Sequence, residues 1–170
     1  MLRFAPLAGS LLPCVLCVLC ACQKQPQEPE KAPSTSPPSA RVESRVRTAK
    51  APDGPDAARL IGVALAKERA EGREMVVYVG AAWCEPCRRF HAAAESGALD
   101  AAFPKLSLLE FDMDKDRDRL AAAGYSPRMI PLFAIPNGDG RASGRSFEGS
   151  VKGDGAVAEI TPKLTALLQR

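Results

Sequence analysis

Apolar residues beyond residue 53 recur with two different spacings, and this pattern predicts alternating helices and strands. Between residues 56 and 71 they form the broad stripe of an amphipathic helix, with Pro55 near its start and Gly72 after its end. The apolar, β-branched run at 75–79 is typical of a strand covered on both faces. The same patterns predict helices at 84–96, 98–103, 115–123 and 156–168, strands at 106–113, 131–135 and 145–148, and a hairpin turn at 137–138. We therefore expect an α/β three-layer sandwich, with a mixed four-stranded sheet and helices on both faces.

The first 22 residues have the layout of an export signal. Arg3 is their only charge, and an apolar run follows from residue 11 to residue 21. A membrane-spanning helix needs about 20 apolar residues, and this run is shorter, so we expect the segment at 1–22 to be cleaved.

Residues 19–22, Leu-Cys-Ala-Cys, resemble the lipobox that directs cleavage and lipidation of bacterial lipoproteins. Cys20 departs from the usual pattern, which has Ala, Ser or Thr at that position. The resemblance implies that Cys22 becomes a lipid-bearing N-terminus, and cleavage without lipidation is the alternative. Gln23 stands where an Asp retains enteric lipoproteins in the inner membrane. We therefore expect a lipid-anchored protein on the periplasmic side of a bacterial envelope, with the outer membrane favoured over the inner one.

Residues 23–52 differ from the rest of the chain in composition. They contain six prolines and almost no large apolar side chain, which predicts a disordered, Pro-rich tether. The remaining residues, 53–170, form the predicted folded domain and carry sixteen basic and seventeen acidic side chains. This near-neutral charge, with only 5% aromatic residues in the whole chain, argues against nucleic acid as a partner.

Cys84 and Cys87 directly follow the strand predicted at 75–79 and open the next helix. The free N–H groups and dipole of a helix N-terminus stabilise an anion, so we expect a lowered pKa for Cys84 and predict it to be the nucleophile. Residues three apart on a helix have Cβ atoms about 5–6 Å apart, so a small adjustment allows a disulfide. Cys87 would then resolve a mixed disulfide formed at Cys84.

With Trp83 before the cysteines and Pro86 between them, this segment resembles the active-site motif of the thioredoxin superfamily. The resemblance spans roughly residues 56–170 and implies a thioredoxin-like fold with thiol-disulfide oxidoreductase activity. It also implies that Pro131 is a cis proline facing the cysteine pair, and that Trp83, Ile130 and Pro131 form the groove for a client peptide. From the residues themselves we expect no cofactor and no bound metal.

Two residues near the cysteines depart from the thioredoxin pattern. Cytosolic thioredoxin has a buried Asp six residues before its first active-site cysteine, and Tyr78 stands there in this chain, so proton transfer must differ. Glu85 replaces the usual Gly and places a negative charge beside the predicted thiolate.

His91 is also close to the cysteines in sequence, but about 10 Å of helix rise separates it from Cys84. We therefore interpret His91 as a histidine on the helix flank and not as a metal ligand.

Together these features predict a membrane-tethered, monomeric thiol-disulfide oxidoreductase that exchanges its cysteine pair with protein thiols and disulfides. Ile130 before the proline resembles reducing thioredoxins, so we expect a net reductase. Its electrons would come from a membrane donor such as a thiol transporter, because the sequence has no flavin or nicotinamide motif. One alternative is a Cu(I) carrier, although copper chaperones of this superfamily usually pair Cys-x-x-x-Cys with a distant His. A redox-silent binding module is the other alternative.

Overall fold

The computed structural model describes residues 45–169 of the chain. The predicted signal at 1–22, the lipidation site Cys22 and most of the tether at 23–52 lie outside the described residues. Within residues 45–169, no helix combines the length and the apolar character that a membrane crossing requires.

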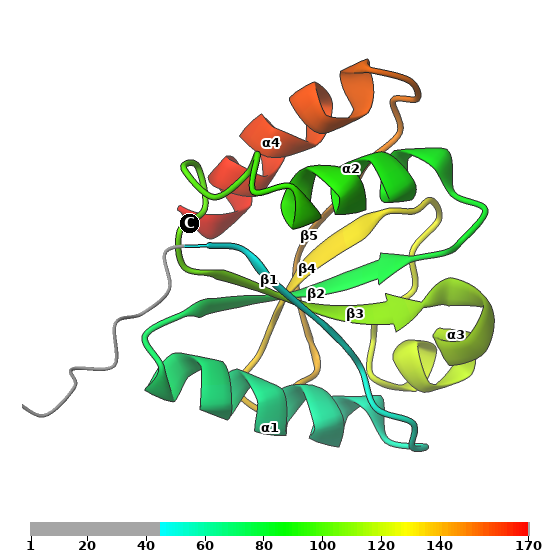
Figure 1. Cartoon of the computed structure of the whole chain (residues 1–170). Helices are drawn as coiled ribbons and strands as arrows, with labels where there is room; N and C mark the ends of the chain where they lie inside the picture. The colour runs from blue at the N-terminus through cyan, green and yellow to red at the C-terminus, as the bar shows by residue number, and fades with distance from the viewer. Residues whose placement is uncertain (1–44, 170) are drawn as a thin grey trace, which may run out of the picture. The chain divides into compact units, whose positions relative to one another are not determined.

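A mixed five-stranded sheet in the order β1-β3-β2-β4-β5 lies at the centre of the described domain (Figure 1). The parallel pairs are β1 with β3 and β3 with β2, whereas β2 with β4 and β4 with β5 are antiparallel. The strands are β1 (Arg47–Lys50), β2 (Glu74–Gly80), β3 (Leu106–Asp112), β4 (Leu132–Pro136) and β5 (Ala142–Glu148).

Two helices cover each face of this sheet (Figure 1). They are α1 (Ala57–Ala70) with α3 (Met113–Ala122) on one face, and α2 (Glu85–Glu95) with α4 (Gly155–Leu168) on the other. Side chains alternate along β2, so Val76 and Tyr78 enter the core beneath α2 and α4, while Val77 and Val79 enter the core beneath α1 and α3. Both faces of β2 are therefore buried, as the apolar run at 75–79 predicts.

The sheet has five strands and not the predicted four, because β1 lies inside the segment predicted to be a tether. The sequence Arg-Thr-Ala-Lys of β1 has no apolar alternation that could predict a strand. Its pairing comes from the backbone ladder, in which Arg47 lies opposite Ser107 of β3. Just before β1, the Val46 N–H donates to Asp100 Oδ1 at 2.8 Å. The fold therefore begins before residue 53.

The short helix predicted at 98–103 is also wrong, because this segment forms successive turns. Gly97 has a φ of +78° and Pro104 closes the segment, so too few residues remain to propagate a regular helix. Leu99 and Phe103 still contribute apolar side chains to the core beneath α2 and α4. The last strand is longer than predicted, since β5 begins at Ala142.

Candidate active site at the Cys84–Cys87 disulfide

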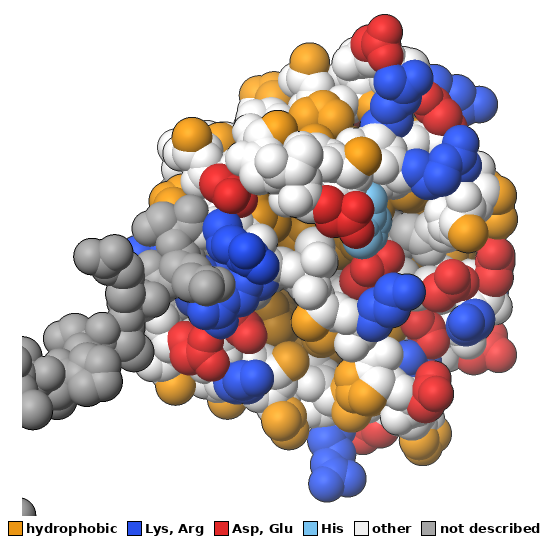
Figure 2. Space-filling view, viewed as in Figure 1, with side chains coloured by type: hydrophobic (Ala, Val, Ile, Leu, Met, Phe, Trp, Pro, Cys, Tyr) orange, Lys and Arg blue, Asp and Glu red, His pale blue; other side chains and the backbone are white. Residues whose placement is uncertain are grey.

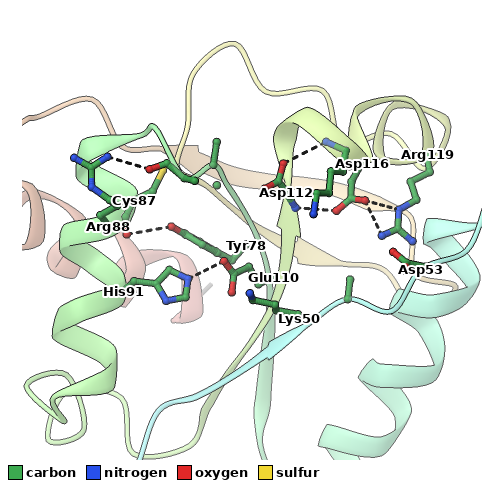
Figure 3. A pocket seen from close by; sticks show the side chains of 15 residues that line it. Lys50, Asp53, Tyr78, Cys87, Arg88, His91, Glu110, Asp112, Asp116 and Arg119 are labelled. Carbon is green, nitrogen blue, oxygen red and sulfur yellow. Dashed lines mark hydrogen bonds and ion pairs between the residues drawn. The ribbon is translucent and has the colours of Figure 1, made fainter.

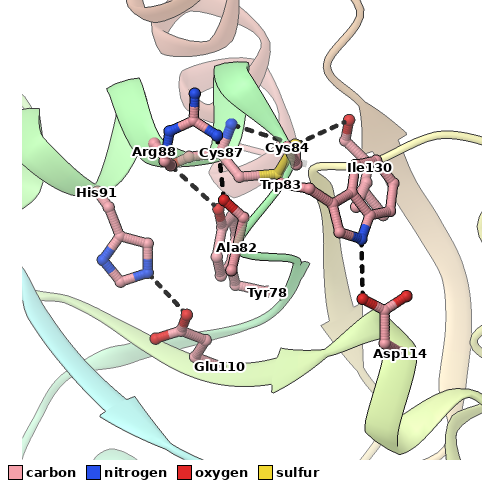
Figure 4. Close-up of a disulfide and its surroundings, with 10 residues drawn as sticks. All are labelled: Tyr78, Ala82, Trp83, Cys84, Cys87, Arg88, His91, Glu110, Asp114 and Ile130. Atoms are coloured by element: carbon pink, nitrogen blue, oxygen red, sulfur yellow. Dashed lines mark hydrogen bonds and ion pairs between the residues drawn. A yellow bond between two sulfur atoms is a disulfide. The ribbon is translucent and has the colours of Figure 1, made fainter.

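Cys84 and Cys87 are joined by a disulfide at the N-terminus of α2 (Figure 4). Cys84 is the N-cap, with extended backbone angles, and its Sγ accepts a hydrogen bond from the Cys87 N–H at 3.3 Å. Pro86 occupies the first turn, where a missing N–H costs nothing. The Cα atoms of the two cysteines lie 5.2 Å apart. The local sequence thus places one sulfur where a helix N-terminus stabilises negative charge.

The loop before β4 faces the disulfide from the other side. The Ile130–Pro131 peptide bond is cis, the conformation that the thioredoxin resemblance implies for this proline. The Ile130 carbonyl oxygen lies 3.6 Å from Cys84 Sγ (Figure 4). Pro131 is anchored behind the loop, because its carbonyl accepts from the Gly149 N–H at 2.8 Å. The structure thereby brings Cys84, Cys87, Ile130 and Pro131 together.

A groove of about 460 Å³ opens beside Cys84. Trp83 lines it and is 65% exposed, and its indole Nε1–H donates to Asp114 Oδ2 at 2.8 Å, which fixes the ring orientation (Figure 4). Pro86 of the same motif also lines it, and the other apolar lining comes from segments distant in sequence, namely Met113, Pro127, Met129 and Ile130. Cys84 is therefore the cysteine that borders an open, partly apolar surface.

No family model matches the sequence, and no curated protein matches it. Among solved structures, thioredoxin O1 from Arabidopsis thaliana in its oxidised state shares 18% identity, with a TM-score of 0.44, and the match covers 74% of this chain and 96% of that one. Poplar thioredoxin h, PtTrxh4, shares 20% identity with a TM-score of 0.44, covering 74% and 98% of the two chains. The order and directions of the five strands, with two helices on each face of the sheet, decide the architecture. The fold is thioredoxin-like.

Tyr78 stands where cytosolic thioredoxin has its buried Asp, and the thioredoxin-like frame buries it completely. Its ring packs against Phe90 and Phe133, and its hydroxyl makes a long contact of 3.5 Å with the Cys87 carbonyl oxygen. Burial, reinforced by the negative charge of Glu110, raises the pKa of Tyr78 far above its ordinary value. Because the hydroxyl keeps its proton at neutral pH, Tyr78 cannot accept a proton from Cys87.

A second cavity, of about 350 Å³, lies on the Cys87 side of the disulfide (Figure 3). His91 and Glu110 line it and pair across the gap between α2 and β3, with Nε2 and Oε1 2.8 Å apart. The hydrogen bond to Glu110 raises the pKa of His91. Figure 2 shows the histidine on the surface beside acidic groups. His91 thus has a carboxylate partner that the sequence analysis did not identify. The sequence signal for it was Glu110, an acid between the apolar residues Leu109 and Phe111 of β3.

The charge of Glu85 beside the cysteines is compensated by its surroundings. Its carboxylate accepts the Gly153 N–H at 2.9 Å and the Arg89 guanidinium at 2.8 Å, and these bonds lower the pKa of Glu85. Arg89 also pairs with Asp154. Arg88 instead donates to the Ala82 carbonyl at 3.0 Å. Glu85 thus links the first turn of α2 to the loop before α4.

The described residues contain no cluster of three or more His, Cys, Asp or Glu side chains suited to hold a metal ion. His91 is directed to Glu110 and away from the sulfurs in Figure 4.

Proposed function

We propose that this protein is a thiol-disulfide oxidoreductase that exchanges the Cys84–Cys87 pair with client proteins. The observation that carries the proposal is the position of Cys84 Sγ. It lies at the N-terminus of α2, bonded to Cys87, beside the Ile130 carbonyl and at the edge of an open groove. A helix N-terminus favours the thiolate that attacks disulfides. Cys84 is itself only 4% exposed, and the groove brings a client to its edge.

In the reducing direction, the Cys84 thiolate attacks one sulfur of a client disulfide. An S–S bond forms between Cys84 and the client, and the other client sulfur leaves as a thiolate that takes up a proton. Cys87 then loses its proton and attacks Cys84 Sγ, which closes the Cys84–Cys87 disulfide and releases the second client thiolate. Two electrons pass to the client, and an external dithiol returns them to the cysteine pair.

The sequence supports a membrane-tethered version of this activity. An export-type segment, the lipobox-like residues ending at Cys22 and a Pro-rich stretch precede the folded domain. In this proposal, lipid on Cys22 holds the protein at the periplasmic side of a bacterial envelope, at the outer membrane. There it acts as a monomeric net reductase supplied by a membrane thiol donor.

Reduction of insulin with dithiothreitol as electron source tests the oxidoreductase activity. We expect turnover by the wild-type chain and none by Cys84→Ser. When dithiothreitol is left out, Cys87→Ser should retain the attacking sulfur but accumulate a mixed disulfide with insulin, because the resolving thiol is missing. Equal inactivity of the wild type and Cys84→Ser would overturn the proposal.

Two further measurements test the finer parts of the proposal. Equilibration with glutathione gives the potential of the pair, and a value near about −270 mV supports a reductase, whereas one near −120 mV indicates an oxidant. Membrane fractionation of the full chain should find wild-type protein with the membranes and Cys22→Ala released from them.

A further inference from the structure

Exposed large apolar side chains are concentrated around the mouth of the active site. Within residues 45–169 these are Trp83, Met129, Val151 and Val63. Trp83 and Met129 line the groove beside Cys84, and Val151 lies between Ser150 and Lys152, which also line it. Only Val63, on α1, lies elsewhere. An apolar patch that surrounds a reactive sulfur is typical of a docking surface.

Three basic side chains line the same groove: Arg117 of α3, Arg128 of the loop before β4, and Lys152 of the loop before α4. All three residues are exposed, and within the described part of the chain no ion pair involves their side chains. They come from three separate segments and meet only around Cys84. Their charge is therefore available to a bound partner.

Three carboxylates in or beside the groove accept hydrogen bonds, and one of them, Glu85, also pairs with a cation. Glu85 accepts the Gly153 N–H and the Arg89 guanidinium. Asp114 accepts the Trp83 indole N–H, and Glu148 accepts the backbone N–H groups of Arg128 and Met129 at 2.8 and 3.1 Å. Among the residues lining the groove, three cations face one carboxylate, Glu85, which leaves an excess of positive charge.

We propose that this groove selects extended client segments that carry acidic side chains beside the disulfide to be reduced. The inference rests on the proposed oxidoreductase function and names its substrate class. Acidic residues flanking the client cysteine would meet Arg117, Arg128 and Lys152, while an apolar residue contacts Trp83 and Met129. Complementary charge acts mainly by speeding the productive encounter and by disfavouring basic segments.

The test uses three peptides of one length, each with an internal disulfide flanked by Glu, Gln or Lys. Because flanking charge also changes the intrinsic reactivity of a thiol, each rate is divided by the rate of the same peptide with dithiothreitol. At about 0.01 M ionic strength, where the Debye length is about 30 Å, we expect the Glu peptide to exceed the Lys peptide by about tenfold or more. At 1 M salt the ratio should fall below about twofold.

Variants test whether the three groove cations cause the charge preference. The triple variant Arg117→Gln, Arg128→Gln, Lys152→Gln should abolish the preference for Glu over Lys. The charge-retaining triple Arg117→Lys, Arg128→Lys, Lys152→Arg should keep it. A matched control, Arg59→Gln, Arg69→Gln, Lys105→Gln, removes the same charge from exposed positions that do not line the groove, and should keep it too.

Binding is measured separately from turnover by the fluorescence of Trp83, the only tryptophan in the chain, in a Cys84→Ser, Cys87→Ser variant. The Glu peptide should change the emission at a lower concentration than the Lys peptide.

Turnover of all three peptides without charge preference overturns the inference and leaves the oxidoreductase function standing. Charge-selective binding without turnover in the wild type overturns the proposed function and supports the groove's selectivity. If the wild type shows neither turnover nor charge-selective binding, the proposed function and the inferred selectivity are both overturned.

Discussion

The phenol ring of Tyr78 occupies the space in which a side chain of Gly80 would begin. A Cβ atom placed on Gly80 would lie 2.9 Å from the Tyr78 hydroxyl oxygen and 3.1 Å from the nearest ring carbon. The ring cannot move aside, because Phe90, Phe133 and His91 surround it. The absence of a side chain at residue 80 is thus what allows a tyrosine beneath the active-site helix.

Gly80→Ala should therefore destabilise the domain by about 1–3 kcal/mol, the usual cost of overpacking a core. In a Tyr78→Phe background the cost should be smaller, because the closest contact, to the hydroxyl oxygen, is gone. Urea unfolding of the two single variants and the double variant measures this coupling. Additive effects of the two substitutions would show that the contact with the Tyr78 hydroxyl does not determine the loss of stability in Gly80→Ala.

Arg73 is a buried cation that ties three segments together. Its guanidinium donates to Ser107 Oγ at 2.8 Å and to the carbonyl oxygens of Arg45 and Leu106, both at 2.6 Å. Lysine keeps the charge but cannot reproduce this planar fork, so Arg73→Lys should lower the free energy of unfolding by about 1–3 kcal/mol. Denaturant titration measures the loss. Ser107→Ala, which removes one acceptor, should cost less, and a larger loss would contradict this account.

The His91–Glu110 pair should make stability depend on pH. Glu110 on β3 faces His91, as do Glu95 of α2, Lys50 of β1 and the Tyr78 ring. The pKa of His91 is raised in the folded state, so the stabilisation is complete below the unfolded value of about 6.5 and is lost as pH rises through the folded value. Glu110→Gln should thus destabilise more at pH 5.5 than at pH 8.5, with a pH-dependent part of about 1 kcal/mol or less, because the pair is partly open to solvent.

Proton NMR gives a direct measure of this pair, since His91 is the only histidine in the chain. Its pKa should fall in Glu110→Gln. In Glu95→Gln it should change less, because that carboxylate lies 3.9 Å from the ring and is mostly exposed. An unchanged titration in Glu110→Gln would refute the assigned cause.

Pro162 lies at an exposed position inside α4. Because proline has no backbone N–H, it cannot donate the hydrogen bond that a helix residue normally makes. Pro162→Ala should restore that bond and raise the free energy of unfolding by about 1–3 kcal/mol, after allowance for the freer unfolded chain. Thermal and urea unfolding measure the gain. Lower stability in the alanine variant would show that the helix depends on the proline.

Local patterns in the sequence predicted those elements whose signals lie within a few residues. The stripe at 56–71, the apolar run at 75–79 and the cysteines at the next helix start correspond to α1, β2 and the N-terminus of α2. Each depends on side-chain periodicity or on a cap. β1 has no such signal, because its strand pairing is with a distant segment: Thr48 lies opposite Leu108, sixty residues away.

The sequence by itself determined that Cys84 would open a helix directly after a buried strand, because helix caps and apolar runs are local properties of the chain. The tertiary structure alone decided which residues surround that sulfur. Met113, Arg117, Arg128, Met129 and Lys152 meet at one groove, and Glu110 meets His91 beside the other cysteine. These contacts depend on the order of the strands and on the paths of the loops. Both are set by the packing of the whole core and not by any single segment.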